Sequence, residues 1–242
     1  MNFLARVDRD PLSMYTPELE AIVSAEVPEL IAIRAVPGMW SARAIDRVSS
    51  AASSIEDTLW RLASDRDRRR ASLFRAARAG WRGPVHVQIM AASADDCEVC
   101  SMALVADARA AGIKPERIVL EISETEEVED AAKLALATAL WRSLGFRTAT
   151  RNFGAGLSGL AMLLRLEPDL VCLDGDWVRR VSIDQGTRII IAGVVNTCRE
   201  LGCAVIADGV VSERLSQTLI DLGIDKQSGP LFEHLAAALP DS

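Results

Sequence analysis

From residue 85 to the C-terminus, short runs rich in β-branched residues alternate with longer segments of helical periodicity. This alternation is typical of repeated βα units, which build a parallel sheet covered by helices. The predicted strands are residues 85–90, 117–122, 146–150, 170–174 and 204–207, and the predicted helices are about 96–111, 127–144, 156–165, 187–201 and 212–222. No long linker or composition break divides the chain, so we expect a single barrel-like domain over residues 1–242.

The first 80 residues follow a less regular pattern. Residues 30–36 are compatible with a strand, about 42–80 is mostly helical in character, and the path of 1–30 is not defined by the sequence. The stretch D-R-D-R-R-R at 65–70 is the one concentrated basic feature. Because no aromatic residues are interleaved with it as stacking platforms, we interpret it as a solvated helix face and not as a nucleic-acid site.

Composition narrows the class of protein. Of 242 residues, 50% are hydrophobic, which is ample for a substantial buried core, and the formal charge of -7 argues against a general nucleic-acid partner. The longest apolar stretches are too short to span a bilayer and the N-terminus lacks a secretory segment, so we expect a soluble cytoplasmic protein without a membrane partner.

Five cysteines are scattered along the chain, an odd number that does not suggest a disulfide framework. Cys97 and Cys100 form one C-x-x-C, but no second pair or nearby histidine completes a tetrahedral zinc site. We therefore expect reduced thiols and no metal cofactor. The two histidines, His86 and His234, are far apart and lack a nucleophile motif, so we expect structural roles for both.

The most informative motif is T-A-T-R-N-F-G-A-G-L-S-G-L-A-M-L at residues 148–163. It resembles the D-D-F-G-x-G-x-S-S-L-x-x-L segment of EAL-type cyclic-di-GMP phosphodiesterases. In the resemblance, Arg151 and Asn152 stand where the family has two metal-binding aspartates. Carboxylate oxygens suit Mg²⁺ and Mn²⁺, whereas arginine brings a fixed positive charge.

Further segments match the same family in order and spacing, and two of them keep three carboxylates in all. The run I-V-L-E-I-S-E-T-E at 118–126 resembles the L-E-I-T-E strand end, so Glu121 corresponds to a metal-ligand glutamate and Glu124 to its loop-organising partner. The run A-V-I-A-D-G-V-V at 204–211 resembles V-I-A-E-G-V-E, and Asp208 keeps a carboxylate there.

Other matching positions have lost the family residue. Cys172 stands at the catalytic lysine, Gln88 at a metal-ligand asparagine and Ser228 at a glutamine. The naming motif E-A-L-x-R is best matched by I-A-I-R-A-V-P-G, which places Arg34 at its glutamate and Gly38 at its phosphate-binding arginine.

The resemblance implies a modified TIM-type (β/α)8 barrel with one antiparallel strand. It also implies a possible homodimer through the segment 154–164, although Leu157, Leu160 and Met162 there fit a core-facing helical spacing as well.

The replacements make the former metal site more positive, and we expect an electropositive site without a two-metal centre. Our hypothesis is that Arg151, together with Arg34, lies among Glu121, Glu124 and Asp208 in a salt-bridge network that replaces the ions. Any ligand at the site would then meet Arg151, Glu121 and Asp208.

Three functions are compatible with this pattern. We favour a catalytically inactive EAL-like regulatory protein that binds another protein in cyclic-di-GMP-related signalling. A sensor that binds cyclic-di-GMP without cleaving it is the second, since arginine is suited to phosphate contacts. The third is a slow phosphodiesterase that uses Glu121, Glu124 and Asp208.

Overall fold

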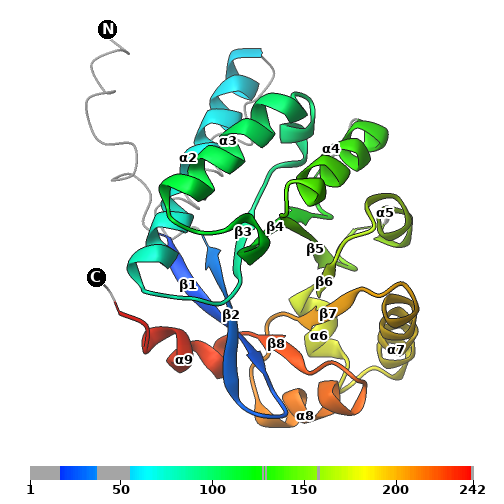
Figure 1. The fold of residues 1–242 in the computed structure, drawn as a ribbon. Coiled ribbons are helices and arrows are strands. Elements are labelled where there is room, and N and C mark those ends of the chain that lie inside the picture. The colour runs from blue at the N-terminus through cyan, green and yellow to red at the C-terminus, as the bar shows by residue number, and fades with distance from the viewer. Residues whose placement is uncertain (1–16, 37–54, 127, 129, 157–158, 241–242) are drawn as a thin grey trace, which may run out of the picture.

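The computed structural model describes residues 17–36, 55–126, 128, 130–156 and 159–240. Within these residues, eight strands form a closed barrel in sequence order (Figure 1). The strands are β1 (Glu18–Ser24), β2 (Glu29–Val36), β3 (Val85–Gln88), β4 (Ile118–Ser123), β5 (Arg147–Phe153), β6 (Leu170–Leu173), β7 (Ala204–Ala207) and β8 (Lys226–Ser228).

One strand runs against the others. β1 pairs antiparallel with both β2 and β8, while every other neighbouring pair is parallel. A turn at residues 25–28 joins β1 to β2, and a connection this short can only link antiparallel strands. The predicted barrel with one antiparallel strand is confirmed.

Helices cover the outside of the barrel (Figure 1). They are α2 (Ile55–Arg78), α3 (Cys97–Ala110), α4 (Ala131–Ser143), α5 (Gly159–Leu166), α6 (Gly175–Arg180), α7 (Gln185–Glu200), α8 (Glu213–Asp221) and α9 (Glu233–Ala237). Several begin at a side chain that accepts a hydrogen bond from the first turn, such as Asp96 for α3 and Asp130 for α4. These caps satisfy amide groups that the helix itself leaves without partners.

The predicted strands and helices from residue 85 onward are all present, with boundaries that differ by a few residues. The sequence pattern did not reveal β1, β8, α6 and α9, which are short or begin in the poorly patterned N-terminal part. Gly38 and Leu157 lie outside the described residues.

The basic stretch at 65–70 differs from the prediction. Asp65 on α2 is fully buried and forms ion pairs with Arg68 and Arg69, of which Arg69 is buried too. The Ser93 hydroxyl also contacts Asp65, at 3.5 Å. The stretch is therefore not a wholly solvated face. Its carboxylate is paired inside the protein, as a buried charge must be.

The interior of the barrel is filled in layers. A cluster of apolar side chains from six strands forms the lower part: Ile22, Ala32, Val119, Ala149, Leu170, Cys172 and Ile206. Because side chains on a strand alternate between its two faces, the next inward-facing residues lie two positions further along. In β2, β4 and β5 these residues are Arg34, Glu121 and Arg151, so a charged layer lies above an apolar one.

Candidate functional site

Six strands, and the residue directly after a seventh, contribute to the charged layer at the carboxyl ends of the parallel strands. We call its members the rim cluster: Glu20 from β1, Arg34 from β2, His86 from β3, Glu121 from β4, Arg151 from β5, Cys172 from β6, and Asp208 directly after β7. In a (β/α)8 barrel this end is the one that carries functional residues, because the connecting loops meet there.

Arg34 is at the centre of the rim cluster and is only 1% exposed. Its Nε donates to Glu121 Oε1 at 2.8 Å, and one terminal nitrogen donates to Asp208 Oδ1 at 2.8 Å. The other terminal nitrogen lies 3.3 Å from Cys172 Sγ. All three nitrogens of the guanidinium group are therefore engaged, and two of its partners are carboxylates, of which Glu121 corresponds in the family resemblance to a metal-ligand glutamate.

Glu121 is completely buried, with two basic groups against the same oxygen. Besides Arg34, His86 Nδ1 lies 2.8 Å from Glu121 Oε1. Burial alone would raise the pKa of this carboxyl, but Arg34 and the His86 hydrogen bond outweigh it and hold the pKa well below its usual range. Glu121 is therefore a carboxylate at any ordinary pH.

His86 completes the pairing of Glu121. It is 2% exposed, and burial lowers the pKa of its imidazole even though the hydrogen bond to Glu121 acts in the opposite direction. The ring is therefore neutral near pH 7, with the proton on Nδ1 directed at the carboxylate. A structural role was predicted for His86, and the structure adds that this role is inside the rim cluster.

Cys172 occupies the position that the resemblance gives to the catalytic lysine. The thiol is completely buried, and burial together with the nearby Glu121 raises its pKa well above the ordinary value. It is therefore neutral and accepts a contact from Arg34. A neutral thiol cannot supply the positive charge of a lysine ammonium group.

Arg151 lies at the edge of the rim cluster. Its Nε is 3.8 Å from Glu121 Oε2 and 4.0 Å from Asp208 Oδ2, distances of ion pairs and not of hydrogen bonds. The Arg151 side chain is 22% exposed, against 1% for Arg34. The salt-bridge network thus has the expected acids Glu121 and Asp208, but Arg34 and not Arg151 makes the close contacts.

Three predicted site residues are bonded elsewhere. Glu124 Oε2 accepts from the Gly154 amide at 2.6 Å, so it holds the loop after β5 and lies outside the salt-bridge network in which we expected it. Gln88 donates to Glu126 at 3.4 Å. Asn152 has a left-handed backbone with φ 55° and donates to Ser123 Oγ at 2.9 Å. None of these hydrogen bonds reaches Arg34.

A cavity of about 300 Å³ opens above the rim cluster. Its charged lining consists of Arg34 and Arg151 with four acids, Glu18, Glu20, Asp208 and Glu233, and Ser228 contributes to the wall. The expectation of an electropositive site is therefore wrong for this cavity. The expectation counted charge changes only at the family's motif positions. The acids of β1 and α9 lie outside those motifs and were therefore left out of the count.

The donor set of the rim cluster does not fit two divalent cations. Glu121 Oε1 and Asp208 Oδ1, the carboxylate oxygens nearest the centre, already accept from Arg34. At roughly 4 Å and an effective dielectric constant near 20, a fixed positive charge disfavours a cation by about 4 kcal/mol per unit of ion charge. Among the described residues, no group of three or more acidic, histidine or cysteine side chains has a metal-binding arrangement.

Sequence reasoning missed Glu20 as a site residue. Glu20 is opposite Arg34 in the β1–β2 register, and its Oε2 lies 3.6 Å from an Arg34 terminal nitrogen. Its strand belongs to the poorly patterned N-terminal segment. Recognising a hairpin before residue 36 would have placed Glu20 beside Arg34, since paired residues share one face of a sheet.

A family model for the EAL domain matches residues 52–234, three quarters of the chain. The chain belongs to the EAL domain family. The predicted resemblance is thereby confirmed, and the barrel with its antiparallel strand is the EAL-type form of the fold.

Two of the curated proteins that resemble this chain come from Escherichia coli K12. The EAL domain is 29% identical over 129 residues to the blue light- and temperature-regulated antirepressor BluF, an alignment covering 53% of this chain and 32% of BluF. It is 25% identical over 120 residues to the probable cyclic di-GMP phosphodiesterase PdeA, covering 50% of this chain and 16% of PdeA. The chain thus matches a third or less of the length of these relatives.

Solved structures agree on the fold. BlrP1 of Klebsiella pneumoniae, in complex with manganese and cyclic di-GMP, has a TM-score of 0.80 and 25% identity, covering 90% of this chain and 55% of BlrP1. A standalone EAL protein of Vibrio cholerae O395 in its cyclic-di-GMP-bound form has a TM-score of 0.77 and 24% identity, covering 92% of this chain and 91% of that protein. The second comparison shows the fold alone.

Within the described part of the EAL domain, every helix is too short or too polar to cross a lipid bilayer.

Proposed function

We propose that this EAL domain does not hydrolyse cyclic di-GMP and acts in cyclic-di-GMP-related signalling by binding another protein. The observation that carries the proposal is the position of Arg34, whose guanidinium group joins Glu121 and Asp208 at 2.8 Å each. A permanent cation fixed between these two acids takes the place in which the family resemblance expects metal ions.

The chemistry of hydrolysis supports the first half of the proposal. Two-metal phosphodiesterases use the ions to activate water and to stabilise the charge that develops on phosphate. Here Asn152 contributes an amide bonded to Ser123, and Cys172 contributes a neutral thiol. Neither side chain can replace an aspartate or a lysine in those roles, so the residues for generating a nucleophile are missing from the rim cluster.

The comparisons support the second half. BluF, a relative at 29% identity, is by name an antirepressor, and a protein of that description works on another protein. A fold can persist after its chemistry is lost when its surface serves a partner. The salt bridges of Arg34 would then maintain the barrel end for a structural purpose.

A non-hydrolysing cyclic-di-GMP sensor is the second candidate. It is favoured by Arg151, which lies on the cavity wall and whose Nε makes no hydrogen bond. A guanidinium group in that position can pair with a phosphate oxygen. Against this candidate, the cavity presents four carboxylates to two guanidinium groups, and two phosphodiesters would meet a net negative lining.

Calorimetry and product analysis test these alternatives together. The chain is titrated with cyclic di-GMP in the presence and absence of Mn²⁺, and the mixture is then assayed for the linear dinucleotide. We expect neither binding heat nor linear product. Micromolar binding without product would establish the sensor instead, and turnover would establish a phosphodiesterase.

Partner binding is tested by capture from the native cytoplasm. The chain is used as bait, and the standalone EAL protein of Vibrio cholerae O395 is a control bait with the same fold. We expect at least one protein to be retained by this chain and not by the control, and its direct binding is then measured with purified components. Equal retention profiles for the two baits would contradict the proposal.

A further inference from the structure

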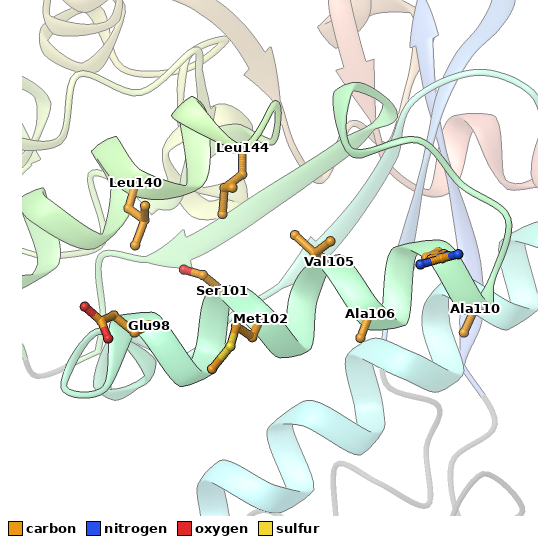
Figure 2. Close-up of a pocket in the computed structure, with 9 residues that line it drawn as sticks. Glu98, Ser101, Met102, Val105, Ala106, Ala110, Leu140 and Leu144 are labelled. Atoms are coloured by element: carbon orange, nitrogen blue, oxygen red, sulfur yellow. The ribbon is translucent and has the colours of Figure 1, made fainter.

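A wide apolar groove runs between α3 and α4 on the outside of the barrel (Figure 2). Its volume is about 930 Å³, and α3 contributes Met102 and Val105, while Leu140 of α4 and Leu144, the residue directly after α4, line the other side. The side chains of Leu140 and Leu144 extend towards α3. Met102 is 67% exposed and both Val105 and Leu144 are 38% exposed. An exposed apolar groove of this size is typical of an interaction surface.

The α3 side of the groove carries an ordered stripe of residues. Glu98, Met102, Val105 and Arg109 follow one another at spacings of four, three and four residues, and all four are exposed. Residues spaced in this way lie along one side of a helix, as in the contact seam of a coiled coil. The opposite side of α3, which includes Leu104 and Ala108, is buried against the barrel.

The stripe matches a second copy of itself that runs in the opposite direction. Glu98 and Arg109 lie at its two ends and are separated by about 16 Å of helix, while Met102 and Val105 lie symmetrically about its midpoint. A second α3 in antiparallel orientation places each Glu98 opposite an Arg109 and each Met102 opposite a Val105. Within the described residues, neither Glu98 nor Arg109 has an ion-pair partner.

We propose that this groove binds a second copy of the chain, with α3 packed antiparallel on α3 across a two-fold axis. Such an interface uses the same patch on both subunits, so the Glu98–Arg109 charge pair forms twice and neither copy is left with an unmatched end. The small residues Ser101, Ala106 and Ala110 line the groove and allow the two helices to approach closely. Antiparallel alignment also brings opposite ends of the two helix dipoles together.

This interface is separate from the segment 154–164 that the family resemblance suggests for dimers. Leu160 and Leu164 on α5 are exposed as well, at 59% and 70%, so that segment provides a matched comparison surface. The inference does not depend on the proposed function, because a dimer through α3 leaves the rim cluster unchanged.

The decisive experiment is a charge swap measured by sedimentation equilibrium of the full chain. Glu98→Arg alone and Arg109→Glu alone each place like charges opposite one another twice, and we expect the dissociation constant of the dimer to rise about tenfold for each. The double variant E98R/R109E restores opposite charges in the reversed sense. We expect it to recover the wild-type constant to within about twofold.

Two apolar variants locate the contact independently. Met102→Lys is expected to dissociate the dimer and Leu164→Lys to leave it intact, and because both side chains are exposed, circular dichroism should show the same fold for both. A wild-type chain that stays monomeric at its highest soluble concentration would overturn the proposal and leave the groove to a different protein. So would a dimer that is unaffected by either single charge reversal, or one that only Leu164→Lys dissociates.

Discussion

At the scale of single residues, Arg34 explains how the barrel holds the buried Glu121 close to the partly buried Asp208. Glu121 is completely buried, and an unpaired charge there would cost several kcal/mol. Arg34 compensates this charge, and the neutral His86 ring donates a hydrogen bond to the same oxygen. A buried ion pair adds little net stability compared with apolar residues of similar size. Removing one partner is nevertheless strongly destabilising, because it leaves the other charge buried and unpaired.

Replacing Arg34 tests this account. We expect Arg34→Met to lower the free energy of unfolding by about 3–5 kcal/mol, because Glu121 and Asp208 lose their nearest cation in a buried setting. The measurement is urea denaturation followed by circular dichroism. Arg188→Met on exposed α7 is the control and should change stability by less than about 0.5 kcal/mol. Equal effects of the two variants would contradict the central role of Arg34.

The neutral state of His86 predicts a pH dependence. Its folded-state pKa is lowered, so below its ordinary value of 6.5 the unfolded chain takes up a proton that the folded chain does not. Stability should therefore decrease as pH falls from 6.5 towards about 5, with a contribution of up to about 1.4 kcal/mol per pH unit. His86→Asn keeps a donor for Glu121 but cannot titrate, and should remove that contribution.

Denaturation across this pH range provides the measurement. His234 on α9 is exposed, so His234→Asn should retain the wild-type slope. A wild-type slope that persists in His86→Asn would mean that another group titrates.

The site residues could be predicted only where a motif pointed to them. Arg34, Glu121, Cys172 and Asp208 occupy matching motif positions, and the structure brings all four together. Which arginine holds the acids could not be predicted, since both face the barrel interior and only the packing determines their reach. Glu20 belongs to a strand with no motif, and so the sequence did not indicate its contribution to the site.

At the scale of elements, the periodicity of apolar residues predicted the βα units, because each helix and each strand must bury one face. β8, with the sequence K-Q-S, has no apolar pattern and is held by its neighbours β1 and β7. Helix α5 was also only partly anticipated. The spacing of Leu160 was compatible with the core as well as with a dimer surface, and Leu160 is 59% exposed because this short helix packs through Leu163 and Leu166. Contacts with neighbouring elements, and not the local sequence pattern, determine the pairing of β8 and the packing of α5.

Two glycines, one inside α7 and one just after it, should respond in opposite ways to replacement by alanine. Gly202 follows the helix with φ 73° and open space at its Cβ position, so Gly202→Ala should cost about 1 kcal/mol from backbone strain alone. Gly193 lies inside α7, also with open space, and Gly193→Ala should stabilise the protein by about 0.5–1 kcal/mol. Thermal denaturation of both variants measures the difference, and shifts of the same sign would contradict the assignment of the helix end.

At the scale of the whole molecule, binding of an ion to the folded state alone would raise its stability. We expect Mn²⁺ to leave the melting temperature of the wild-type chain unchanged at matched ionic strength, because the rim cluster does not fit the ion. The variant R34E/R151D/N152D restores carboxylates at three positions, and Mn²⁺ at a hundredfold excess over its Kd should add about 2.7 kcal/mol to its stability.

Differential scanning calorimetry with and without the ion provides the comparison. A rise in the wild-type melting temperature would show that the cluster accepts a cation after all. A variant that folds but gains nothing from Mn²⁺ would show that the three replacements are not what separates this chain from a metal-binding EAL domain.

The cluster of apolar side chains beneath the rim cluster has a consequence for evolution. Since the lower part of the barrel is closed by Ile22, Val119, Leu170 and their neighbours, residues of the rim cluster can change without loss of the fold as long as the charges of the cluster stay balanced. Substitutions in the rim cluster are then constrained by charge balance. An EAL domain built in this way can acquire new roles through intermediates that still fold.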